Sequence, residues 1–208
     1  VGARFYTYSS TLHYVLEACA ENKVPLLVLD RPNPNGHYVD GPVLEKAQAS
    51  FVGLNPIPVV HGCTLGELAR MINGEGWLAN GAKASLNVIP VANYTHASPV
   101  HVTIAPSPNL PNDQSIALYP SLCLFEGTNV SIGRGTDLQF QVAGTNIAGL
   151  GDYTFTPVPK PGAMDPPLKG QICYGYDLSS LPARNLGFSL KYLLYFYSKS
   201  GLGEKFFT

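Results

Sequence analysis

Hydrophobic residues near the start of the chain follow the spacing of a helix and then that of a buried strand. Apolar side chains recur at every third or fourth position, as on the buried face of a helix, at Leu12, Val15, Leu16, Cys19 and Ala20. The hydroxyl run 9–11 supplies an N-cap for this helix, which we expect to end near Asn22. The apolar run 26–29 comes next and is typical of a parallel strand buried on both faces.

A second strand and helix follow a loop rich in proline and asparagine. Residues 57–60 form a short apolar strand, and Thr64 and Glu67 have the spacing of a capping box at the start of a helix. That helix carries apolar side chains on one face: Leu65, Leu68, Ala69 and Ile72. Glycines end it, and the weak alternation over 84–91 predicts a further strand. Helices and strands in this order predict an α/β fold.

The composition changes between residues 96 and 111, where prolines stand among polar residues. Such segments are typical of the passage between domains, so we expect one domain over 1–97 and a second over 98–208. In the second domain, 115–125 predicts a helix followed by a short buried segment. Periodicity does not separate strand from helix in the remaining apolar segments, which are 153–155, 172–176 and 188–197.

The composition excludes several classes of protein. Only 13% of the 208 residues are charged and the formal net charge is −1, so the chain lacks the basic field with which proteins bind nucleic acid. Its apolar runs are far shorter than the roughly 20 residues of a membrane-spanning helix. With 21 Gly and 18 Pro, we expect many ordered turns and few long surface helices.

The four cysteines form no CxxC pair and have no histidine at metal-ligand spacing: they are Cys19, Cys63, Cys123 and Cys173. We interpret them as small apolar residues, with one disulfide or a metal site as alternatives, and we expect no metal and no cofactor. The chain begins at Val1 and stops directly after an aromatic run. Both ends look cut, so we expect a part of a longer protein, of undetermined oligomeric state.

Asp30 and His61 each come directly after a predicted strand. In open α/β sheets ligands bind beyond the carboxyl ends of the strands, so we expect both side chains to face one crevice. A histidine that only satisfies its own turn is the alternative for His61. Prolines stiffen the loop 31–36, which therefore holds the side chains of Arg31 and Asn33 in fixed directions.

Glu126 stands behind four apolar residues, and Arg134 follows it in a glycine-rich segment. A carboxyl group in an apolar setting can serve as a proton donor near neutral pH. Two interpretations remain open: a buried structural Glu126–Arg134 pair that holds the loop, or a carboxylate and a guanidinium both presented to a substrate. Twelve tyrosines suit a site that grips sugar rings, although the same residues can fill an ordinary core.

Six segments, spread from residue 1 to residue 136, share their order and spacing with one known family: Val1–Tyr8, Leu29–Pro34, Pro58–Gly62, Ile72–Trp77, Pro106–Pro111 and Glu126–Thr136. In these segments the chain resembles the bacterial exo-β-N-acetylmuramidases of the NamZ type, long catalogued as a domain of unknown function. It departs from the family pattern at Cys63, where methionine is usual, and at Leu138-Gln139, where Pro-Phe is more usual.

The resemblance implies an α/β protein in which residues 1–97 are the C-terminal part of a Rossmann-like domain. Residues 98–208 are then a smaller α/β domain, truncated at its C-terminus, and the active-site cleft lies between the two. The implied reaction is hydrolytic removal of N-acetylmuramic acid from the non-reducing ends of peptidoglycan fragments, in the periplasm or outside the bacterial cell. Family members carry a Glu-His-Gly segment ahead of the position of Val1, a candidate source of the catalytic acid, so we expect this chain alone to be inactive.

The resemblance and the residue patterns together give a set of candidate site residues. Glu126 is the expected catalytic residue, and the expected substrate-binding residues are Asp30, Arg31, Asn33, His61, Asn109 and Arg134. The lactyl carboxylate of muramic acid requires a cation, and Arg31 or Arg134 can bind it through two parallel hydrogen bonds. The alternative function is a non-catalytic peptidoglycan-binding protein, in which Glu126 and Arg134 only brace their loop.

Overall fold

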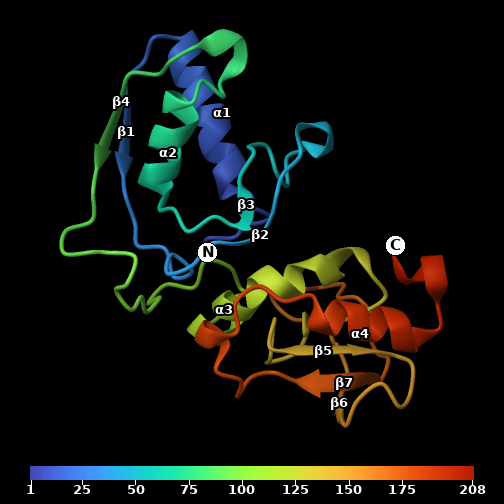
Figure 1. The fold of residues 1–208 in the computed structure, drawn as a ribbon. Coiled ribbons are helices and arrows are strands. Elements are labelled where there is room, and N and C mark those ends of the chain that lie inside the picture. The colour runs from blue at the N-terminus through green and yellow to red at the C-terminus, as the bar shows by residue number, and fades with distance from the viewer. The chain divides into compact units, whose positions relative to one another are not determined.

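Two helices and a parallel pair of strands form the centre of the first hundred residues. A computed structural model describes residues 1–208, apart from the side chain at position 183, and the chain divides into two units, 1–100 and 101–208. In the first unit, helices α1 (Tyr8–Glu21) and α2 (Leu65–Gly74) lie side by side against strands β1 (Leu26–Leu29) and β4 (Leu86–Ile89) (Figure 1). The sequence predicts helix, strand, strand, helix and strand in this order; all five are present, and the structure adds one strand, Asp40–Val43, that was not predicted.

The start of α1 differs from the expectation. The N-cap is Thr7, which makes no side-chain capping hydrogen bond, and Ser9 and Ser10 are buried inside the helix. The predicted N-cap at 9–11 is therefore wrong, because these small hydroxyl residues allow close packing rather than ending the helix. The other end agrees with the prediction: Asn22 is the C-cap, and its Nδ2 donates to the Ala18 carbonyl at 2.9 Å.

Strands β1 and β4 are parallel, with Leu26 opposite Leu86 and Val28 opposite Val88. One face of this pair packs on the two helices, in a core that includes Leu16, Leu68, Ile72, Leu26, Val28 and Leu86. On the other face Leu27 is 56% and Leu29 is 70% exposed. The prediction that this strand is buried on both faces is thus wrong for the described chain, in which the helices cover one face only.

A separate antiparallel pair joins β2 (Asp40–Val43) to β3 (Pro58–Val60). The sequence analysis predicted β3 but not β2, whose residues Asp40, Gly41 and Pro42 have low strand propensity. Because β3 pairs with β2 and not with β1, Asp30 and His61 do not follow strands of one sheet. The prediction that Asp30 and His61 lie at one edge of a single sheet is therefore wrong.

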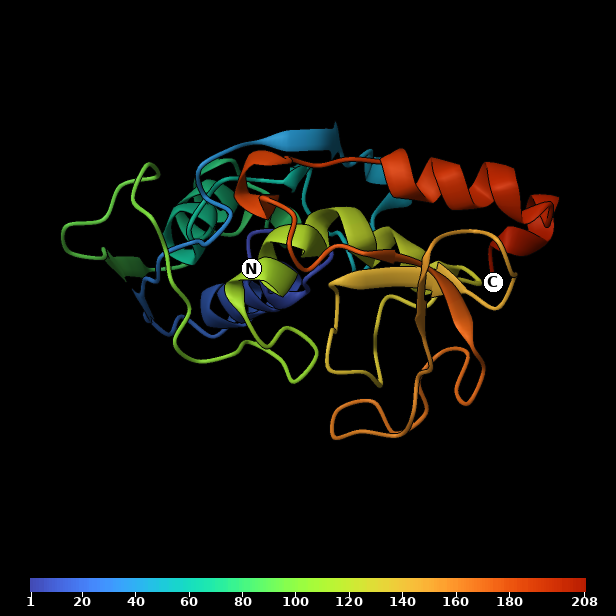
Figure 2. The same ribbon diagram turned by 90° about the horizontal axis from the view of Figure 1, so that it is seen from below.

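The second unit contains a three-stranded antiparallel sheet and two helices. The strands are β5 (Val142–Thr145), β6 (Tyr153–Phe155) and β7 (Cys173–Asp177), in the order β5-β7-β6. Helices α3 (Asp113–Leu122) and α4 (Lys191–Ser200) lie on the same side of this sheet in Figure 1, and Figure 2 shows the long loop that joins β6 to β7. Short 3-10 turns occupy Lys46–Gln48, Ala79–Gly81, Cys123–Gly127, Ala183–Asn185 and Gly203–Phe206.

The core of the second unit is aromatic. Phe125, Phe140, Phe196 and Phe206 are fully buried, and the ring of Phe196 meets that of Phe125 edge to face at 5.8 Å. The predicted helix over 115–125 is confirmed in its centre, but it starts at Asp113 and its last turn is a 3-10 turn. Within the part of the chain that the structure describes, none of the helices combines the length and hydropathy that crossing a membrane requires.

The cysteines are free thiols. Cys123 and Cys173 are buried, as expected of small apolar residues, whereas Cys19 and Cys63 are half-buried. Burial raises the pKa of the Cys173 thiol to about 11, so this side chain is uncharged in the folded protein.

Candidate active site

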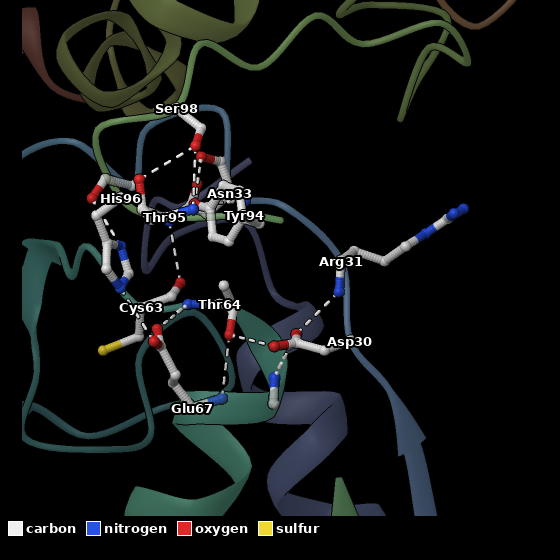
Figure 3. A network of polar contacts seen from close by, with 12 residues as sticks. Asp30, Arg31, Asn33, Cys63, Thr64, Glu67, Tyr94, Thr95, His96 and Ser98 are labelled. Carbon is white, nitrogen blue, oxygen red and sulfur yellow. Dashed lines mark hydrogen bonds and ion pairs between the residues drawn. The ribbon is translucent and has the colours of Figure 1, made fainter. Parts of the chain in front are cut away.

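The carboxylate of Asp30 lies at the N-terminus of α2 (Figure 3). Its Oδ1 accepts hydrogen bonds from the backbone N–H groups of Gly66 at 2.8 Å and Arg31 at 2.9 Å, and its Oδ2 accepts one from the Thr64 hydroxyl at 2.6 Å. A Cβ atom at position 66 would lie 2.7 Å from this carboxylate, so the contact requires glycine. Free N–H groups and the helix dipole favour a negative charge here, and Asp30 therefore stabilises α2. Its contact with a substrate stays a prediction.

The predicted capping box at the start of α2 is confirmed. The Thr64 hydroxyl accepts from the Glu67 backbone N–H at 3.1 Å, and Glu67 Oε2 accepts from the Thr64 backbone N–H at 2.8 Å. The second oxygen of Glu67 lies 3.0 Å from His96 Nε2, as Figure 3 shows. Both acidic residues near this helix start thus serve backbone or histidine donors.

The loop 31–36 is held by the side chain of Asn33, which is buried. Asn33 Oδ1 accepts from the backbone N–H of Asn35 at 2.9 Å, and Asn33 Nδ2 donates to the Cys63 carbonyl at 3.0 Å. Gly2 lies against the same amide, and a Cβ there would be 2.2 Å from Asn33 Oδ1. These contacts fix the loop in one conformation. The Arg31 side chain points away from the network around Asp30 (Figure 3).

A pocket with a volume of about 110 Å³ opens beside this loop. Three of the predicted site residues line it: Arg31, Asn33 and His61. Tyr6, Tyr8 and Ser9 also line it and are not among the predicted site residues. The first unit therefore brings a cation, an amide, an imidazole and two phenols to one concave surface.

His61 lines the pocket and is only 9% exposed. Its Nδ1 is buried and has no hydrogen-bond partner among the described residues. Burial lowers the pKa of the His61 imidazole to about 4. The ring is therefore neutral at pH 7 and holds an unused polar atom beside the pocket. The alternative of a histidine that merely satisfies its turn does not account for this unpartnered atom.

Tyr6 and Tyr8 form the aromatic part of the pocket, with ring centroids 5.4 Å apart. Burial raises the pKa of Tyr6, so its hydroxyl stays protonated and able to donate. Sequence reasoning missed both residues as site residues, although they lie in the segment 1–8 that carries the family resemblance. Two tyrosines at the start of a helix, one just before it and one at its first residue, are the feature that could have identified them.

In the second unit, Glu126 and Arg134 form an ion pair between Oε1 and Nη2. Glu126 is the last residue but one of the 3-10 turn after α3, and its side chain is 41% exposed. The Arg134 guanidinium lies 5.2 Å from the centroid of the Phe140 ring, a cation–π contact. The backbone at Gly133 has φ +81°, and a Cβ there would lie 2.3 Å from the Leu138 carbonyl oxygen, so the turn requires glycine.

Asn109 is buried within its proline-rich loop. Its Nδ2 donates to the Gly162 carbonyl at 2.9 Å, and its backbone N–H donates to the Ser107 hydroxyl at 3.1 Å. Asn109 therefore holds two loops of the second unit together, and its contact with a substrate stays a prediction.

The candidate residues thus fall into separate groups within the two units. Arg31, Asn33 and His61 line one pocket of the first unit, while Glu126 and Arg134 pair in the second. Among the described residues, no three His, Cys, Asp or Glu side chains gather in a way that could hold a metal ion.

Comparison with known proteins accounts for both units. The family "Exo-beta-N-acetylmuramidase NamZ, N-terminal" matches residues 1–114, and "Exo-beta-N-acetylmuramidase NamZ, C-terminal" matches residues 117–202. The chain is 46% identical over 149 residues to the peptidoglycan beta-N-acetylmuramidase NamZ of Bacillus subtilis. That alignment covers 69% of this chain and 35% of the Bacillus protein, so the chain spans about a third of this relative.

Two solved structures share the fold. One is a DUF1343 family protein from Bacteroides fragilis, with a TM-score of 0.97, 51% identity, and coverage of 100% of this chain and 60% of that one. Another DUF1343 family protein from the same organism has a TM-score of 0.75 and 30% identity, and covers 85% of this chain and 50% of that one. The mixed α/β fold with small sheets is therefore one that related proteins adopt in crystals.

Proposed function

Because the chain belongs to the exo-β-N-acetylmuramidase NamZ family, we propose that it takes part in hydrolysing peptidoglycan, by releasing N-acetylmuramic acid from non-reducing ends. The observation that carries this proposal is the match of both family regions, in order, over residues 1–114 and 117–202. In the reaction the bond from the anomeric carbon to the leaving oxygen breaks, that oxygen gains a proton, and water supplies the hydroxyl of the released sugar. The bacterial cell envelope, periplasmic or secreted, is the proposed location.

For the fold, we propose that residues 1–97 form the C-terminal part of a Rossmann-like domain and 98–208 a smaller α/β domain, with the cleft that the resemblance implies. Two features support the first part. Strands β1 and β4 are parallel and joined through α2, which is the connection of a βαβ unit. The exposed apolar face with Leu27 and Leu29 is where a doubly wound sheet would carry its second layer of helices.

The pocket of the first unit is the proposed sugar-binding site. The lactyl carboxylate of muramic acid pairs with the Arg31 guanidinium, which lines the pocket and points away from Asp30. The neutral His61 ring offers its unpartnered Nδ1 to a hydroxyl or acetamido group, since a buried polar atom gains most from a new partner. Tyr6 and Tyr8 pack against the C–H surface of the ring. Asp30 and Asn33 hold the loop that presents Arg31.

Glu126 is the proposed catalytic carboxyl of the second unit, with Arg134 orienting it. The ion pair fixes one oxygen of Glu126, and the exposed part of the side chain remains open to a ligand. Asn109 supports the neighbouring proline-rich loop. The alternative, a catalytic acid contributed by a segment ahead of Val1, leaves Glu126 as a brace for the loop.

The test is release of 4-nitrophenol from 4-nitrophenyl β-N-acetylmuramide by the intact protein. If Glu126 acts at the reaction centre, Glu126→Gln lowers kcat by about a hundredfold or more, whereas Glu75→Gln, an exposed control, leaves kcat unchanged. Arg31→Ala raises KM for the muramide roughly tenfold or more and leaves the weak hydrolysis of the glucosaminide, which lacks the carboxylate, unaffected. Binding of muramic acid without any release of nitrophenol would contradict the proposed hydrolase and support the alternative, a non-catalytic peptidoglycan-binding protein.

A further inference from the structure

Residues 93–98, which we term the strap, run back over the loop that carries Arg31 and Asn33 (Figure 3). The Tyr94 hydroxyl accepts from the Asn33 backbone N–H at 3.3 Å and donates to the Asn33 carbonyl at 3.4 Å. A Cβ at Gly36 would lie 2.8 Å from the Tyr94 hydroxyl, so strap and loop are in close contact. The strap thus lies against the backbone that sets the position of Asn33.

His96 fastens the strap through both nitrogens of its ring. Nδ1 lies 3.0 Å from the Gly36 carbonyl oxygen, and Nε2 lies 3.0 Å from Glu67 Oε1. Both partners are acceptors, so each ring nitrogen must carry a proton to make its bond. A neutral imidazole has only one N–H, and only the imidazolium satisfies both contacts.

The two partners of His96 are themselves fixed. Glu67 is held by the capping box at the start of α2, and the Gly36 N–H donates to the Asn33 carbonyl at 2.9 Å. An imidazolium between them joins the helix to the far end of the loop 31–36. The sequence analysis missed His96, because its partners lie 60 and 29 residues away along the chain.

We propose that His96 is a positioning residue of the sugar site, which in its protonated form fastens the strap over the loop 31–36 and so holds Asn33 and Arg31 at the pocket. The link to sugar binding rests on the proposed function, whereas the link to the loop does not. His96 touches neither the pocket lining nor the proposed reaction centre, and it acts through the loop.

The groups that face His96 come from three parts of the unit. They are the Glu67 carboxylate of α2, the backbone of Gly36 and Gly62, and the Tyr94 ring of the strap at 5.9 Å. The hydrogen bond to Glu67 raises the pKa of His96, and partial burial lowers it. The negative charge of Glu67 and the backbone hydrogen bonds to Gly36 and Gly62 raise the pKa further. The His96 pKa therefore lies above its ordinary value, and the strap is fastened below it and released as the pH rises through it.

The exposure of His96 and Glu67 limits how strongly the protonation of His96 can change sugar binding. The side chains of His96 and Glu67 are 47% and 42% exposed, and pairs of this kind have modest strength. We expect N-acetylmuramic acid to bind roughly two- to fivefold more weakly when His96 is neutral than when it is charged.

The first test follows the histidine and the loop by NMR in the intact protein. Glu67→Gln keeps an N3 side chain that completes a capping box but removes the charge beside His96. We expect this variant to lower the pKa of His96, and Glu75→Gln at the other end of α2 to leave it unchanged. In the natural protein the amide signals of Arg31 and Asn33 should shift with the same midpoint as the His96 ring. Loop signals that ignore the His96 midpoint would overturn the proposal.

The second test measures the dissociation constant of free N-acetylmuramic acid by calorimetry between pH 5.5 and 8.5. Binding to the natural protein should weaken along the His96 titration, and His96→Gln should bind weakly at every pH. His101→Gln, a change at an exposed histidine of the second unit, should keep the natural pH dependence. A His96→Gln variant with the full pH dependence would refute the role of His96. Absence of any binding would instead defeat the proposed function, and the NMR result would then decide the role of His96 in the loop alone.

Discussion

The carboxylates of the two units follow similar sequences but have different partners. Asp30 and Glu126 each come after four apolar residues. Asp30 accepts two backbone N–H groups and a hydroxyl at the start of α2, whereas Glu126 pairs with the Arg134 guanidinium at the end of a 3-10 turn. A helix N-terminus presents free donors that take up a nearby carboxylate, and the end of a 3-10 turn presents none.

This difference shows that the role of an acidic residue depends on donors that are remote in sequence. The partners of Asp30 include Thr64 and Gly66, more than thirty residues away, whereas Arg134 is only eight residues from Glu126. In the first unit the carboxylates are structural supports and the pocket is lined by a cation, an imidazole and phenols. In the second unit the carboxylate stays partly exposed.

The largest expected effect comes from removing Asp30. Asp30→Ala leaves the Thr64 hydroxyl and the Gly66 N–H without their acceptor and should lower the free energy of unfolding by about 3 kcal/mol. For a chain of this size that corresponds to roughly 6–12 °C in the melting temperature, measured by calorimetry.

Glu126→Ala is the matched control and should cost under about 1 kcal/mol, as expected of a partly exposed pair. Equal losses from both substitutions would remove the distinction between the two carboxylates.

A second prediction concerns the stability of the protein in acid, where the buried His61 and the exposed carboxylates contribute differently. The folded pKa of His61, about 4, lies below the unfolded value of about 6.5. The unfolded chain therefore binds the proton more tightly, and stability is full above pH 6.5 and falls as the pH drops toward 4. At pH 5 the loss from this group alone is about 2 kcal/mol, at 1.36 kcal/mol per pH unit.

Urea denaturation of the natural protein and of His61→Gln between pH 7.5 and 4.5 measures this loss. Carboxylates contribute equally to both proteins, so the difference between the two stability curves isolates His61. Parallel curves would mean that His61 is protonated as easily in the folded protein as in the unfolded chain.

The parts of the fold that were predicted correctly depend on neighbours in sequence. The capping box of Thr64 and Glu67 and the strand 26–29 are local patterns, and both are present in the structure. The pairing of β3 with β2 is a contact between distant residues, and its partner strand contains glycine and proline, so no local pattern marks it. Burial within α1 likewise overrides the tendency of Ser9 and Ser10 to cap a helix.

The candidate site follows the same rule. The Glu126–Arg134 pair matches one of the two interpretations that the sequence leaves open, because its members are close in sequence, although the pair is partly exposed and not buried. The grouping of Tyr6 and Tyr8 with His61 needs a tertiary fold, since it brings together the start of the chain and the end of β3. Sequence spacing therefore identifies interacting residues that are close along the chain, whereas the residues that line a pocket are identified only from the three-dimensional structure.

The coupling between Glu126 and Arg134 is the smallest expected effect, and it separates the two interpretations of Glu126. In a double-mutant cycle of Glu126→Ala and Arg134→Ala, the coupling free energy should be about 0.2–1 kcal/mol, since both side chains are partly exposed. Arg134→Lys should lose most of this coupling and the contact with the Phe140 ring, because lysine lacks the planar guanidinium. A coupling of several kcal/mol, measured by urea denaturation, would make the pair a structural brace comparable to Asp30. A small coupling together with a large loss of kcat in Glu126→Gln would assign the carboxylate to the reaction.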